Sequence, residues 1–83
     1  MTLLIYVFIY IAAAEAFKDD GNYEFKKKKY DVAIENYTEG IKIRCPDKLL
    51  NAILYTNRAA AQYHRGNKLI IYTPGSYLNI CKS

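Results

Sequence analysis

Residues 14–22 read AEAFKDDGN, and residues 54–61 read LYTNRAAA before a Gly-Asn pair at 66–67. Small residues occur at Gly21, Ala33 and Gly40. Aromatic residues are interspersed with them at positions 17, 25, 30 and 37. Small and aromatic residues in this order are typical of two helices packed closely face to face. The stretch from 14 to 67 therefore predicts one and a half copies of a helical repeat.

The spacing of apolar residues predicts three helices. From residue 14 to 25, apolar and small residues recur at three- and four-residue steps, and the lysine run 26–29 suits the negative end of a helix dipole. Asp31 is a plausible N-cap for a second helix that ends before Pro46. A third helix is expected from about Lys48 to His64. The predicted fold class is all-α.

Charge divides the chain into three parts. All eight acids lie between residues 15 and 47, residues 1–14 carry no charged side chain, and residues 68–83 carry only two lysines. We therefore predict an apolar segment at 1–13 outside the repeat pattern, a partial repeat domain at 14–67 and a divergent tail at 68–83. The turn sequence TPGS at 73–76, where a helix is due, indicates a tail outside the fold. A truncated or alternatively spliced product would have this form.

The N-terminal run TLLIYVFIYIAAA at residues 2–14 invites a targeting interpretation. It is shorter than the about 20 residues of a membrane-spanning helix but suits the core of a signal peptide within residues 1–16. No lysine or arginine precedes it, and its Ile, Val, Tyr and Phe residues favour an extended strand as much as a helix. A buried packing segment, an alternative start of the chain and a signal sequence all remain open.

The sequence offers few other candidate residues for catalysis, metal binding or nucleic-acid binding. Cys45 and Cys81 form neither a disulfide framework nor a metal-binding spacing, so we expect two reduced thiols in an intracellular protein. His64 is the only histidine and has no triad partners in the sequence. The lysines at 26–29, in a chain with a pI near 9.1, are more typical of a solvated helix end than of a nucleic-acid site. We expect no enzyme activity, cofactor, metal, nucleic acid or membrane partner.

Three strings are specific enough to suggest a family: FKDDGN at 17–22, CPDKLLNA at 45–52 and LYTNRAAAQY at 54–63. Together they resemble the tetratricopeptide repeat protein 4 family, whose members are co-chaperones of the heat-shock protein ninety system. The resemblance covers residues 14–67. It implies a partial α-solenoid, with one complete tetratricopeptide repeat hairpin followed by the first helix of a second repeat.

The resemblance also implies a binding site. Clamp-type members grip the C-terminal Glu-Glu-Val-Asp tail of a chaperone with a carboxylate clamp, whose members here would be Lys18, Asn22 and Asn57. Lys18 and Asn22 are four residues apart and share a helix face, and Asn57 follows Asn22 by 35 residues, roughly one repeat. The alternative is a solvated lysine beside two asparagines that brace helix contacts. The family's two third-repeat cations have no counterpart, and Arg58 is not equivalent to them.

The function predicted from the sequence is a protein–protein adaptor. It would dock the acidic C-terminal peptide of heat-shock protein ninety or seventy chaperones in the cytoplasm, with the nucleus as a second compartment. A secreted or membrane-anchored helical module and a non-functional truncation product are the alternatives. Because repeats bury their faces against neighbours, we also expect an uncovered face containing Ile53, Leu54 and Ala61. Self-association, or residues 1–13 or 69–80, would cover it.

Overall fold

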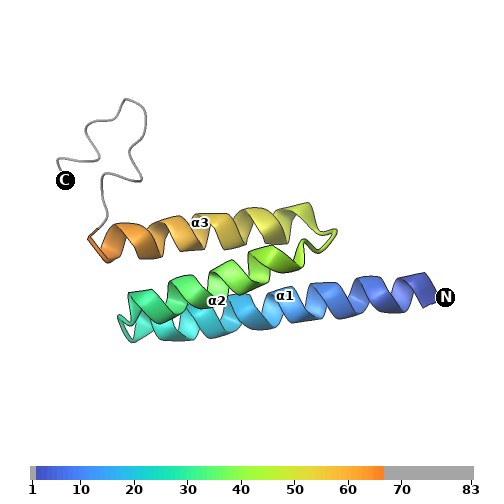
Figure 1. Cartoon of the computed structure of the whole chain (residues 1–83), viewed down its shortest axis with the longest axis horizontal. Coiled ribbons are helices and arrows are strands. Elements are labelled where there is room, and N and C mark those ends of the chain that lie inside the picture. Colours follow the sequence, from blue (N-terminus) through green and yellow to red (C-terminus); the bar gives the residue numbers. More distant parts are fainter. Residues whose placement is uncertain (1, 67–83) are drawn as a thin grey trace, which may run out of the picture.

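The computed structural model describes residues 2–66, and every regular element in that range is a helix (Figure 1). The helices are α1 (Thr2–Lys26), α2 (Tyr30–Ile43) and α3 (Lys48–His64). The first two form an antiparallel hairpin, and α3 packs along α2. The predicted all-α class is confirmed. The predicted tail, with Cys81, lies outside the described residues.

Helix α1 is longer than the sequence pattern indicated, because it runs without a break from Thr2 across position 14. Once a helix has nucleated, each added residue gains a hydrogen bond without repeating the nucleation cost, so the β-branched residues upstream are drawn into it. Val7 and Ile11 are half-buried on the same face as buried Ala14. None of the described helices has the length and apolar character needed to cross a bilayer.

The α1–α2 contact explains why a glycine occupies position 21. A Cβ atom built there would lie 2.6 Å from Cδ1 of Tyr37, whose side chain is 1% exposed. Gly40 is similarly crowded, since a Cβ atom would lie 2.9 Å from Cδ2 of Leu54. Ala33 is fully buried. The predicted close approach of the helices at small residues is confirmed.

The connection between α1 and α2 corrects the predicted N-cap. The backbone N–H of Lys29 donates to the carbonyl of Glu24 over 2.9 Å, and Lys28 adopts a positive φ of 64°. This hydrogen bond closes the turn early, so Lys29 is the N-cap and α2 begins at Tyr30. Asp31 therefore lies in the first turn, where its carboxylate accepts a hydrogen bond from Arg65 over 3.1 Å. Its assignment as the N-cap was wrong.

The α2–α3 connection is held by side chains that bond the backbone. Asp47 caps α3 by accepting from the N–H of Leu50 over 3.1 Å, which fixes the start of the helix at Lys48, as predicted. The Asn51 amide donates to the carbonyl of Cys45 over 2.9 Å. Cys45 is buried and carries a free thiol.

The apolar face of α3 differs from the expectation. Leu54 and Ala61 are fully buried, and Ile53 is half-buried. Leu50, Leu54 and Ala61 already pack on the α1–α2 hairpin, so their burial does not require a fourth helix. The prediction that Leu54 and Ala61 lie on an uncovered face was wrong, because the hairpin itself provides their neighbours.

Candidate functional site

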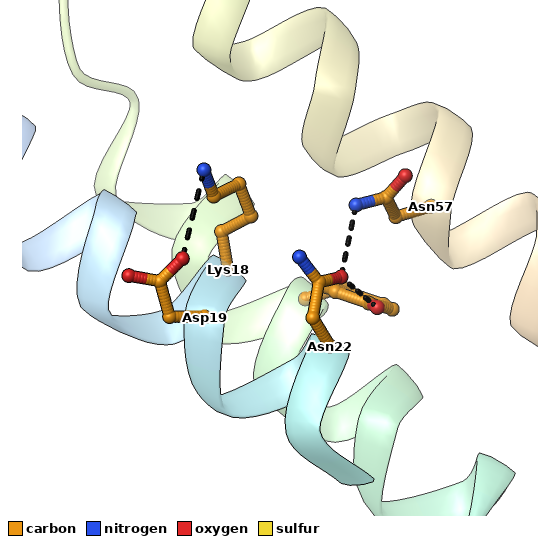
Figure 2. Close-up of polar contacts among 5 residues, drawn as sticks. Lys18, Asp19, Asn22 and Asn57 are labelled. Carbon is orange, nitrogen blue, oxygen red and sulfur yellow. Dashed lines mark hydrogen bonds and ion pairs between the residues drawn. The ribbon is translucent and has the colours of Figure 1, made fainter. Parts of the chain in front are cut away.

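The residues predicted to form a carboxylate clamp lie on facing helices. Helix α1 supplies Lys18 and Asn22, and α3 supplies Asn57; all three are half-buried. The Asn57 amide donates from Nδ2 to Oδ1 of Asn22 over 3.1 Å (Figure 2). The 35-residue separation therefore becomes a direct contact. This contact also agrees with the alternative interpretation, in which the asparagines brace the helices.

Tyr37 of α2 is a third member of this network that was expected only to fill the core. Its hydroxyl donates to Oδ1 of Asn22 over 2.5 Å. Burial raises the pKa of Tyr37 above its ordinary value, so the hydroxyl remains a donor at neutral pH. Oδ1 of Asn22 thus accepts two hydrogen bonds, while its Nδ2 has no hydrogen-bond partner within residues 2–66. The donor end of the Asn22 amide is therefore left unpaired by the described residues.

Lys18 lies one helical turn before Asn22 and contributes positive charge beside the amides. Its Nζ is 3.6 Å from Oδ1 of Asp19, and the two side chains are 23% and 72% exposed. An ion pair this close to solvent contributes at most about 1 kcal/mol. Lys18 can therefore exchange Asp19 for another carboxylate at little cost. Figure 2 shows its ammonium group directed into the space between α1 and α3.

A surface pocket of about 270 Å³ adjoins the asparagines. Its lining combines their amides with apolar and aromatic groups, from Asn22, Phe25, Tyr37, Asn57 and Ala60. The volume falls just below the roughly 300–1,000 Å³ of pockets for drug-sized molecules. It suits one side chain or the end of a peptide better than a cofactor. Among the described residues, no cluster of His, Cys, Asp or Glu could hold a metal ion.

Arg58 follows Asn57 in the chain but points elsewhere. Its Nη1 donates to Oγ1 of Thr38 over 3.2 Å, and its guanidinium lies 5.3 Å from the centre of the Tyr55 ring. These contacts keep Arg58 engaged with α2 and its own helix.

A helix hairpin joined at small residues, with a third helix placing an asparagine opposite the first, is consistent with the all-α helical hairpins of tetratricopeptide repeats. The chain is 59% identical over 54 residues to human tetratricopeptide repeat protein 4, and 57% identical to the mouse protein. It is therefore related to tetratricopeptide repeat protein 4, as the sequence strings indicated. The Hsp70/Hsp90 co-chaperone CNS1 of Saccharomyces cerevisiae is 43% identical over 54 residues.

These matches are partial. Each covers 65% of this chain and 14% of the relative's own length. No family model matches the chain, and no solved structure matches it.

Proposed function

We propose that this chain is a protein–protein adaptor that docks the acidic C-terminal peptide of a heat-shock protein seventy or ninety chaperone in the cytoplasm. The observation that carries the proposal is the amide network across α1 and α3, with Asn57 bonded to Asn22 and Lys18 one turn away. The relative named as an Hsp70/Hsp90 co-chaperone supports the choice of partner.

The chemistry of the three side chains suits a terminal carboxylate. An ammonium group supplies three donors and a full charge, and each asparagine amide supplies two donors. Asn22 and Asn57 share one internal hydrogen bond, so donors remain on both amides for a ligand oxygen. The pocket beside them, with the Phe25 ring and Ala60 in its lining, can take an apolar side chain of the same peptide.

The affinity should be modest. Within residues 2–66, one lysine supplies the charge of this site, and Arg58 is directed away from it. A hydrogen bond to a charged group contributes about 1.5–3 kcal/mol, so a site with one cation should bind an acidic peptide less tightly than a site with several. Salt should weaken binding further by screening Lys18.

Replacing Lys18 by alanine tests whether an acidic peptide binds at a specific site or is only attracted by the net positive charge of the chain. We expect Lys18→Ala to weaken binding of a peptide ending in Glu-Glu-Val-Asp by about tenfold, because it removes a charge-assisted hydrogen bond. Lys28→Ala removes the same charge from an exposed position in the α1–α2 connection and should change affinity less than about twofold. Isothermal titration calorimetry on the full chain measures both.

Equal losses in the two lysine variants would mean that the basic chain merely attracts an acidic peptide. That result would contradict the proposed clamp and leave the helical fold unaffected. Circular dichroism of both variants serves as the folding control. Neither side chain is fully buried, so both spectra should match the parent.

A further inference from the structure

The N-terminal part of α1 extends past the end of the bundle formed by α2 and α3 (Figure 1). We call residues 2–13 the N-terminal apolar segment. Seven of its large apolar side chains are at least 50% exposed, at positions 3, 4, 5, 6, 8, 9 and 10. Side chains of this kind gathered in one place mark an interaction surface, whereas single exposed apolar residues need no explanation.

The distribution of these side chains around the helix indicates the kind of partner. Successive helical residues point about 100° apart, so the exposed runs 3–6 and 8–10 cover most of the circumference. Within the segment, only Val7, Ile11 and Ala13 are half-buried. A protein groove or a second copy would cover one stripe and leave the others in water. A lipid phase surrounds such a helix on every open side.

We propose that the N-terminal apolar segment is a lipid anchor that inserts into one leaflet of a bilayer. Its length is about 18 Å, roughly half of a hydrocarbon core of about 30 Å. Residues 1–14 carry no charged side chain that would oppose entry. Tyr10 lies about 5 Å from the end of the segment nearest the bundle, where its amphipathic ring suits the boundary between acyl chains and headgroups. The inference departs from the expectation, drawn from the sequence, of no membrane partner.

The charges next to the segment do not favour an anionic over a neutral lipid surface. Lys42, Arg44 and Lys48 are exposed around the α2–α3 connection, at the end of the bundle from which α1 projects. Glu39 offsets Lys42 at 3.2 Å, Asp47 caps α3, and Glu15 is exposed on α1 two residues past the segment, so the local charges sum to about zero. Anionic lipid should therefore change the affinity by less than about twofold. Apolar insertion therefore carries most of the affinity.

Vesicle cosedimentation of the full chain tests the proposal. The probes are vesicles of phosphatidylcholine alone and vesicles with about one quarter phosphatidylserine. We expect binding to both, with affinities that differ by less than about twofold. Phe8→Asp, at a position 68% exposed, should weaken binding at least about tenfold by placing a charge in the inserted segment. Leu3→Asp, at a position 74% exposed, should do the same.

The matched control is Tyr23→Asp, which makes the same kind of change on the same helix, at a residue 61% exposed but outside the segment. It should retain binding to within about twofold apart from its effect on net charge. Equal losses for Phe8→Asp and Tyr23→Asp would overturn the proposal. The proposal would also be overturned if the full chain bound neither kind of vesicle and instead formed an oligomer in sedimentation, and if Phe8→Asp converted that oligomer to a monomer. Peptide binding is not needed for either result, so this proposal stands or falls separately from the docking function.

Discussion

Replacing Leu54 by alanine is expected to lower the free energy of unfolding by about 2–5 kcal/mol. The Leu54 side chain is fully buried and lies against Gly40 of α2, so its removal loses apolar burial and leaves a cavity between α2 and α3. For a small domain with marginal stability, such a loss removes most of the folded population. Urea unfolding of the full chain, followed by circular dichroism, measures it.

Leu49→Ala is the matched control, since Leu49 lies on the same helix and is 71% exposed. It should change the free energy of unfolding by less than about 0.5 kcal/mol. If the two variants lost equal stability, α3 would not pack on the hairpin through Leu54.

Gly21→Ala is expected to destabilise the fold by about 1–3 kcal/mol, although alanine is the better helix former by about 1 kcal/mol. The added methyl group would collide with the ring of Tyr37, which is 1% exposed and has little room to move. The clash should also disturb the site, because the Tyr37 hydroxyl bonds the Asn22 amide. Thermal unfolding gives the stability.

Gly40→Ala provides the comparison for Gly21→Ala. Its new methyl group would meet the flexible end of Leu54 at 2.9 Å and Cβ of Phe17 at 3.2 Å, so it should cost less. An increase in stability for Gly21→Ala would show that helix propensity outweighs packing there. The distance between α1 and α2 at Gly21 would then be larger than in the structure.

Much of the fold was predictable because the deciding signals are local. Gly21, Ala33 and Gly40 marked the close helix contact, and the Pro46-Asp47 pair located the start of α3. The wrong predictions concern residues whose environment is set by contacts with other parts of the chain. Asp31 has the right chemistry for an N-cap, but a backbone hydrogen bond to Glu24 closes the turn first. Likewise, the burial of Leu54 depends on how α3 docks, which periodicity does not specify.

The candidate site was predictable only in its outline. The resemblance to clamp-type repeats selects Lys18, Asn22 and Asn57, and helical spacing and repeat length agree with that choice. The role of Tyr37 could not be foreseen, because an aromatic at a core position gives no sign that its hydroxyl will reach an amide on another helix. Similarly, the direction of Arg58 depends on Thr38, 20 residues away in the chain.

The most direct test of the docking function compares two peptides that end in Glu-Glu-Val-Asp, one with a free C-terminal carboxylate and one amidated. Calorimetry on the full chain should show the free acid binding at least about tenfold more tightly, because Lys18 and the two asparagine amides would bond the terminal carboxylate. Equal binding of the two peptides at moderate salt would contradict the proposed clamp.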